Sequence, residues 1–133
     1  MHRAMKRRFV FALLGAALTG CASGPVTVEK AMGLCARGAS AVEVTANGSV
    51  ARLLGNYSSN NGTHEGFLLR SNALMIRIEN NTTITGAIPL SKGETVSLQG
   101  QYECNDGVIH WTHHDPRGRH LGGFIEAGGK IYR

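Results

Sequence analysis

Residues 95–104 read TVSLQGQYEC, and this stretch decides the fold. Small or apolar residues stand at every second position, namely Val96, Leu98, Gly100, Tyr102 and Cys104, and polar residues stand between them. A side-chain period of two is typical of a β-strand with one buried face and one solvated face. The stretch therefore predicts a half-buried strand that carries Cys104 on its inner face.

Shorter stretches with the same period lie on both sides of this strand. The further strands we expect are Val42 to Leu54, interrupted or bulged near Asn47-Gly48, then His64 to Arg70, Ala73 to Glu79, Val108 to His114, Leu121 to Ile125 and Lys130 to Tyr132. Ser71-Asn72 and Asn105-Asp106-Gly107 carry the residue types of tight turns. The polar segment Asn56 to Thr63, which contains a glycine, predicts a mobile loop.

One segment near the start of the chain follows a helical period instead. Its apolar residues keep the i, i+3, i+4, i+7 spacing of an amphipathic helix: Val28, Ala31, Met32 and Cys35. Gly38 stands where such a helix can end. We therefore expect one short helix over Thr27 to Arg37, with Cys35 turned inward.

Five or six short strands with glycine turns and a single short helix predict a mainly β fold, a small closed or partly closed barrel. The order Gly48-x-Val50, an apolar hairpin, and then LSKGETVSLQG over Leu90 to Gly100 resembles the OB-fold. In that fold a glycine permits strong bending of the strand after a lysine-glycine-acid turn. We expect residues 27–133 to form one OB-like β-barrel domain preceded by the helix, because 133 residues suffice for a single core.

The N-terminus has the layout of a bacterial export signal. Arg3 to Arg8 is cationic, Phe9 to Leu18 is apolar, and Leu18-Thr19-Gly20-Cys21 resembles the lipobox of lipoproteins, in which the cysteine is lipidated and becomes the first residue. The apolar run is about half of the roughly 20 residues that a membrane-spanning helix needs. We expect a signal peptide over residues 1–20, a lipid on Cys21 and a tether over residues 21–26. An ordinary signal peptide with another cleavage site is the alternative.

The residue after the cysteine bears on the final location. By the lipoprotein resemblance, Ala22 is not the aspartate that retains such proteins at the inner membrane. We therefore expect a lipid-anchored protein of the cell envelope, attached to the outer membrane and facing the periplasm.

Export also bears on the two remaining cysteines. If Cys21 carries lipid, Cys35 and Cys104 form an even pair in an oxidising compartment, which favours a disulfide between them. Two unpaired buried thiols are the alternative, because the sequence does not show the distance between them.

The charge of the chain argues against nucleic acid as a partner. The formal net charge is +5, but Arg3, Lys6, Arg7 and Arg8 all precede the expected cleavage site, and no acid precedes Glu29. The exported part is nearly neutral and therefore lacks the basic face that nucleic-acid binding needs. One Trp and three Tyr also give few platforms for stacking bases.

The chemically richest segment is Val108 to Gly123, which reads VIHWTHHDPRGRHLGG. Asp115-Pro116-Arg117-Gly118 is a strong turn signal. If that turn closes a hairpin, His114 and His120 lie opposite each other with Cβ atoms about 5 Å apart. That separation suits Zn²⁺ or Cu²⁺, with Asp115 or His64 as a third ligand.

Other readings of these histidines remain open. On a strand, His110 and His114 would lie roughly 13 Å apart and could not share an ion, and His113 would face the core or its rim. The histidines could also fix the turn through hydrogen bonds, with Arg117 and Arg119 solvated.

The same residues carry a family resemblance. Gly107 to Gly123, together with THEGF at Thr63 to Phe67 and the strand Leu90 to Tyr102, is similar to the bacterial family called domain of unknown function 3465. The resemblance covers roughly Gly48 to Tyr132, is most specific at HWTHHDP, and implies no activity. Cys104 stands where the family has a tryptophan, and ENNTTI at Glu79 to Ile84 stands where it has a histidine-asparagine-isoleucine-aspartate run. If that run shares a site with the C-terminal histidines, the site is altered in this chain.

Two classes of function follow from these observations. The first is a noncatalytic periplasmic module that presents His64, His110, His114 and His120, with Asp115 and arginines, to a small polar ligand. It fits a sequence that has neither the nucleophile motif GxSxG nor a phosphate-binding P-loop. The second is a metal-assisted hydrolase of phosphate or glycan bonds, in which His114 and His120 hold the ion and Arg117 or Arg119 clamps an anion. The sequence does not decide whether the protein is an enzyme.

Overall fold

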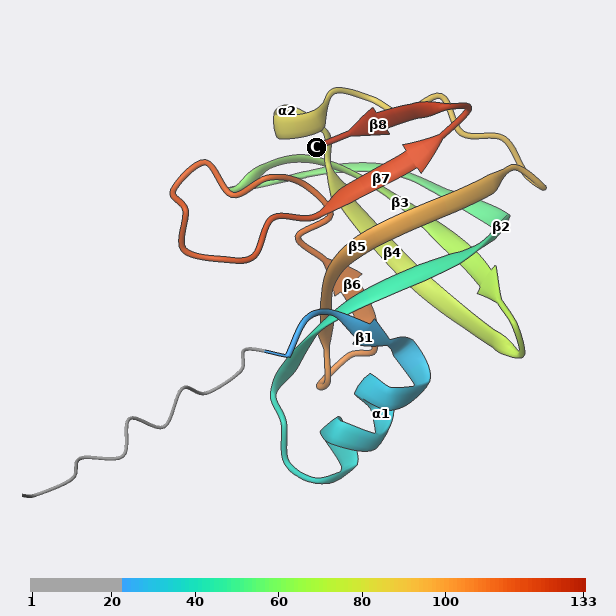
Figure 1. Ribbon diagram of the computed structural model, residues 1–133. Coiled ribbons are helices and arrows are strands. Elements are labelled where there is room, and N and C mark those ends of the chain that lie inside the picture. The colour runs from blue at the N-terminus through green and yellow to red at the C-terminus, as the bar shows by residue number, and fades with distance from the viewer. Residues whose placement is uncertain (1–22) are drawn as a thin grey trace, which may run out of the picture.

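The computed structural model describes residues 23–133 (Figure 1). The expected signal peptide and the expected lipidation site, Cys21, lie outside these residues. The elements in chain order are β1 (Val26–Thr27), α1 (Val28–Ala36), β2 (Ala41–Ser59), β3 (Gly62–Ser71), β4 (Leu74–Asn81), α2 (Thr82–Thr85), β5 (Thr95–Glu103), β6 (Val108–His110), β7 (Phe124–Ala127) and β8 (Lys130–Tyr132). Within the described part of the chain, no helix has the length and apolar character needed to span a bilayer.

Five strands close into a ring in the order β2-β3-β4-β6-β5, and β5 pairs again with β2. The long strand β2 makes this closure possible, because Ala41 to Ser49 pairs with β5 and Ser49 to Ser59 pairs with β3. The contact between β4 and β6 is parallel, and the other pairings in the ring are antiparallel. The expectation of a mainly β, barrel-like fold with a short helix is confirmed. Strands β1, β7 and β8 extend the sheet beyond the ring.

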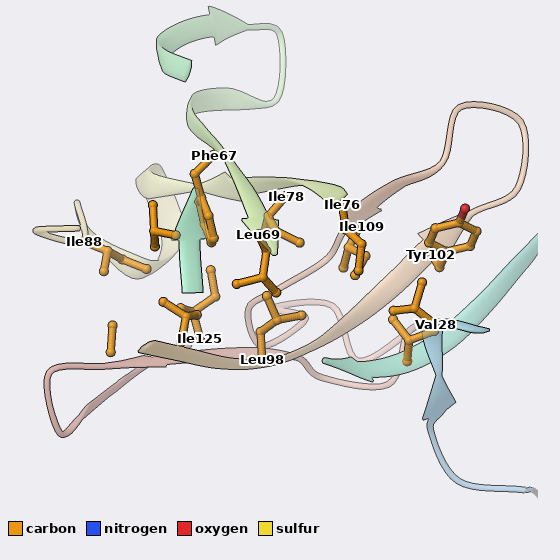
Figure 2. Packing of buried hydrophobic residues seen from close by; sticks show 14 of the residues in the cluster. Val28, Phe67, Leu69, Ile76, Ile78, Ile88, Leu98, Tyr102, Ile109 and Ile125 are labelled. Atoms are coloured by element: carbon orange, nitrogen blue, oxygen red, sulfur yellow. The ribbon is translucent and has the colours of Figure 1, made fainter. Parts of the chain in front are cut away.

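The hydrophobic core lies inside the ring. Figure 2 shows Phe67, Leu69 and Ile78 of the β3–β4 hairpin gathered with Leu98 of β5 and Ile125 of β7, and all five are almost completely buried. Burying each such side chain contributes about 1.5–3 kcal/mol relative to leaving it in water. The core therefore fixes which side chains of each strand point outward, and the candidate site is built from those.

Helix α1 begins and ends close to where the sequence predicts. Thr27 caps its first turn by accepting a hydrogen bond from the Lys30 amide, and its buried residues are Val28 and Ala31. Cys35 at its last turn forms a disulfide with Cys104, with Cα atoms 5.4 Å apart. The disulfide prediction is confirmed, so a covalent bond joins the helix to the end of β5.

The predicted mobile loop over Asn56 to Thr63 is wrong. Strand β2 continues to Ser59 and β3 starts at Gly62, so only Asn60 and Asn61 connect them. Tyr57 and His64 are cross-strand partners whose rings stack 5.1 Å apart. Such pairs stabilise a sheet even where the residues are polar, which composition alone does not reveal.

The predicted interruption of β2 near Asn47-Gly48 is also wrong. The strand runs without a break, and its register shifts lie further on, between Val50 and Arg52 and between Leu53 and Gly55. A bulge bends a strand and increases its twist. These bulges let one strand turn from its partner β5 toward its partner β3.

The expected C-terminal hairpin does not form. Strand β6 ends at His110 instead of His114, and β7 starts at Phe124 and pairs with β5 instead of β6. Residues 111–123 therefore leave the sheet as one long loop, which we call the His loop. Figure 1 shows it projecting from the sheet between β6 and β7.

A candidate ligand-binding cleft

A cleft of about 580 Å³ lies between the His loop and the end of the β3–β4 hairpin that is opposite its turn, beside the short turn that joins β2 to β3. The residues that line it are Asn60, Asn61, His64, Glu79, Asn81, Ile84, His110, Trp111, His113, Asp115, Pro116, Arg117 and Arg119. They come from three separate parts of the chain, residues 60–64, 79–84 and 110–119, and the pairing of β3 with β4 and of β4 with β6 brings those parts together.

His64 enters the cleft from the outer face of β3. It pairs in register with Asn81 of β4, and its ring stacks on Tyr57. Its Nδ1 lies 3.1 Å from the carbonyl oxygen of Gly62. Because a carbonyl oxygen only accepts, Nδ1 donates this hydrogen bond, and in the tautomer with its proton on Nδ1 the other nitrogen, Nε2, is an acceptor.

Glu79 is the most deeply buried charged residue of the cleft, with a relative exposure of only 3%. Its Oε1 accepts from Nε and Nη2 of Arg77, each at 2.5 Å. Its Oε2 is buried and has no hydrogen-bond partner within residues 23–133. Buried polar atoms are satisfied in the great majority of cases, so this oxygen requires an explanation.

Gly66 makes room for this carboxylate. It lies directly opposite Glu79 across the β3–β4 ladder. A Cβ atom at position 66 would lie 3.0 Å from Oε1 and 3.2 Å from Oε2 of Glu79. A side chain at position 66 would therefore press on the Glu79 carboxylate, which glycine leaves in place.

The phenol of Tyr57 lies near the Glu79 carboxylate, which affects its pKa. Burial raises the pKa of Tyr57, and the negative charge of Glu79 and a hydrogen bond from the phenol to that carboxylate raise the pKa further. The phenol consequently stays protonated over the whole physiological range, beside the stacked ring of His64.

The His loop begins with a backbone reversal at Trp111. This residue has φ +55°, a left-handed conformation that is uncommon for a residue with a large side chain. The indole ring stacks on His120 at 4.2 Å and lies 5.5 Å from the ring of His113. The conformation of Trp111 thus takes the chain out of β6 and places three aromatic rings together.

His113 forms the inner wall of the loop and is only 5% exposed. Its Nδ1 donates to the carbonyl oxygen of His114 at 2.6 Å. Burial lowers the pKa of His113, partly offset by that hydrogen bond. The ring is therefore neutral at pH 7, and its Nε2 is an acceptor.

Asp115 holds the tip of the loop. Its carboxylate accepts the backbone N–H groups of Arg117, Arg119 and His120. These bonds, that from Arg117 first, lower the pKa of Asp115 to about 2. The oxygens of Asp115 are therefore largely committed to holding the loop.

A buried polar network ties the start of the loop to the hairpin. The side chain of Asn80 accepts from Thr112 Oγ1 at 3.0 Å and donates to Glu65 and Thr85. Burial raises the pKa of Glu65, and its hydrogen bond from Asn80 partly opposes this rise. The network connects β3, β4, α2 and the loop, and so holds both walls of the cleft in one geometry.

The structure brings six of the residues singled out from the sequence to this cleft: His64, His110, His113, Asp115, Arg117 and Arg119. His114 instead lines a separate depression with Gln99 and Arg133. His120 packs on Trp111, and its charge affects Glu43 of β2, whose pKa is raised mainly by burial. His114 and His120 are not cross-strand partners, because β6 and β7 do not pair. Over residues 23–133, no three His, Cys, Asp or Glu side chains are placed to hold a metal ion.

Sequence reasoning did not single out Glu79, Tyr57, Asn81 or Trp111. A signal for Glu79 was present, since ENNTTI departs from the family pattern at the position expected to meet the C-terminal histidines. The structure indeed brings Glu79 and Asn81 beside the His loop. What the sequence lacked was the β3–β4 register, which sets Glu79 against Gly66.

Comparison with known proteins adds a family and no activity. A family model described as "Protein of unknown function (DUF3465)" matches residues 25–133. This match is longer than the resemblance read from the sequence motifs, and it includes α1 and Cys35. No curated protein and no solved structure matches the chain.

Proposed function

The chain belongs to the family of proteins of unknown function DUF3465, and from that premise we propose that it is a lipid-anchored binding module of the bacterial periplasm. Its cleft takes a small polar ligand between the His loop and the β3–β4 hairpin. The ligand is held by side chains that the barrel-like ring positions in advance.

The single observation that carries this proposal is the unpartnered Oε2 of Glu79 at the wall of the cleft. Leaving a buried acceptor without a partner costs about 1–3 kcal/mol, and more when the group is charged. The fold maintains this cost with a glycine at position 66 and an ion pair from Arg77. A ligand that donates a hydrogen bond to Oε2 removes the cost on binding, which is how a binding site gains affinity.

Thermal denaturation of the soluble domain, residues 22–133, tests the proposal. The panel comprises simple sugars, amino acids, primary amines, inorganic phosphate and Zn²⁺. A ligand at about one hundred times its Kd stabilises the fold by roughly 2.7 kcal/mol, which raises Tm by about 10 °C in a domain of this size. We expect at least one class to give such a shift in the wild type and not in Glu79→Gln.

Glu126→Gln is the matched control, because it removes the same charge from an exposed position on β7. A shift that persists in Glu79→Gln, or the lack of any shift across the whole panel, would contradict a binding cleft at this place.

The anchor is a separate part of the proposal and rests on the N-terminal sequence. We expect the full chain to incorporate radiolabelled palmitate and to fractionate with the outer membrane. Cys21→Ser is expected to abolish the label and release the protein into the soluble periplasm. Recovery of unlabelled, uncleaved wild-type protein from the cytosol would refute this part alone.

The alternative of a metal-assisted hydrolase has no specific observation in its favour. Its two principal residues, His114 and His120, do not line a common cleft. A noncatalytic module is therefore the function that the geometry supports best.

A further inference from the structure

Three polar atoms of side chains that line the cleft are acceptors. Glu79 Oε2 is a carboxylate oxygen without a partner. His64 and His113 each use Nδ1–H on a backbone carbonyl, of Gly62 and His114 respectively, which leaves Nε2 as a lone pair. Three acceptors from three side chains of one cleft require a ligand that donates.

The tautomers are fixed by the backbone and not by the ligand. Reversing either ring would place a lone pair against a carbonyl oxygen at 3.1 Å or 2.6 Å. Burial also keeps His113 in its neutral form by lowering its pKa. The acceptor character of these atoms is therefore built into the fold.

Among common ligand groups, the ammonium of a primary amine matches such acceptors. It has three donors and no acceptor. A carboxylate or a phosphate would set lone pairs against lone pairs, which is strongly unfavourable in a partly dry site. A hydroxyl group offers one donor and brings its own lone pairs to the remaining acceptors.

Charge favours the same group. The Glu79 carboxylate is buried, whereas the side chain of its partner Arg77 is 51% exposed and therefore well solvated. The negative end of this ion pair lines the cleft, so a cation there is attracted by a carboxylate whose only paired charge lies at the more exposed end of the ion pair.

The rim of the cleft has the opposite character. Arg117 and Arg119 lie exposed at the tip of the His loop, beyond the acceptors. Guanidinium groups bind carboxylates and phosphates through paired hydrogen bonds. A ligand that fits both ends carries its cation inward and an anion outward.

We infer that the ligand of this cleft is a small zwitterion, whose primary ammonium group donates to Glu79 Oε2 in the part of the cleft that His64 and His113 also line and whose anionic end faces Arg117 and Arg119. This inference rests on the proposed binding function and names the chemical class of its ligand.

Calorimetric titration of the full chain as exported, purified in mild detergent, tests the inference with matched probe pairs. The primary amines are O-phosphoethanolamine and glycine. Phosphocholine and betaine are their trimethylated counterparts, which keep the positive charge and lose every N–H donor. Each charge-assisted hydrogen bond is worth at least about a factor of ten in affinity. We therefore expect one amine or both to bind at least about tenfold more tightly than the trimethylated partner.

Two variants locate the binding. Glu79→Gln and His64→Gln are each expected to weaken amine binding by about tenfold or more, and Glu126→Gln is expected to leave it unchanged. Circular dichroism and Tm of each variant distinguish lost binding from lost structure. If Glu79→Gln fails to fold, His64→Gln on the exposed side of the ladder provides the same test.

The outcomes separate this inference from the proposed function. Equal binding of amine and trimethylated probes, or amine binding that is insensitive to both variants, overturns the ammonium assignment. The same holds if neither amine binds at millimolar concentration. The proposed binding function is retained if inorganic phosphate or a sugar binds in a manner that depends on Glu79. It is rejected together with the ammonium assignment only if no compound of the thermal-denaturation panel binds.

Discussion

Glu79 shows how one residue can be costly to the fold and useful to a site. Its carboxylate is held against β3 by Arg77, and Gly66 leaves space for it. A hydrophobic residue at position 79 would avoid the cost of a buried charge. The residue-level expectations below therefore concern the groups that keep charges in place around the cleft.

Gly66→Ala is expected to displace the Glu79 carboxylate. The new methyl group would lie 3.0–3.2 Å from both carboxylate oxygens, closer than ordinary contact. Overpacking of this kind costs about 1–3 kcal/mol, to be measured as the free energy of unfolding in urea. Gly33→Ala in α1 is the control, since the nearest atom to a Cβ there lies at 3.6 Å and alanine favours a helix. Equal stability of the two variants would show that the carboxylate moves aside freely.

Asp115→Asn is expected to lower stability at neutral pH. The pKa of Asp115 is about 2 in the folded protein against 3.8 for the free group, so folding favours the charged form. The contribution of the carboxylate is therefore complete above about pH 4 and is lost as the pH falls toward 2. The difference in unfolding free energy between wild type and Asp115→Asn should shrink over that window. A difference that stays constant from pH 6 to pH 2 would mean that the three amide bonds do not depend on the charge.

At the scale of elements, the sequence predicted those helices, strands and hairpins whose formation depends on their own residues. Helix α1 and strand β5 follow from periods of 3.6 and two in their own residues, and both lie within one or two residues of the predicted bounds. The hairpin β3–β4 follows in the same way, because its turn is only two residues long. The buried alternation also located Cys104 correctly, and with it the disulfide.

The His loop could not be predicted by the same reasoning. Whether residues 108–125 form a hairpin depends on which strand receives β7, and that partner is β5, about 25 residues away in sequence. A turn signal at Asp115-Pro116 does not reveal this choice, since Asp115 caps a turn either way. The cleft could not be predicted for the same reason, because Glu79 and His113 come to line it together only through the nonlocal pairing of β4 with β6.

Thr112→Val tests how the loop is held to the hairpin. Valine has the shape of threonine but cannot donate to Asn80 Oδ1, which would remain buried without this bond. We expect a loss of about 1–3 kcal/mol and faster hydrogen exchange of the amides over residues 111–119. Thr95→Val, at an exposed position of β5, should show neither effect. Unchanged exchange in the His loop would mean that Thr112 does not anchor it.

For the molecule as a whole, the disulfide is the largest single constraint on the unfolded chain. It joins residues 69 positions apart, and chain-entropy arguments assign about 4 kcal/mol to a loop of that length. We expect the double variant Cys35→Ala/Cys104→Ala to lose about 2–5 kcal/mol of unfolding free energy. Dithiothreitol should lower the stability of the wild type by a similar amount and leave the double variant unaffected. Equal sensitivity of both proteins to the reductant would contradict a stabilising bond.

The Cys35–Cys104 disulfide also determines which parts of the chain bear an applied force. Tension applied between the N-terminal tether and the C-terminus enters at β1, passes along α1 to Cys35, and crosses the sulfur atoms to Cys104. Four of the five ring strands, β2 to β5, lie inside the covalent bypass between those residues. They bear no load even after the sheet has opened, so the length to which the chain can be stretched is set by the two segments that flank the disulfide.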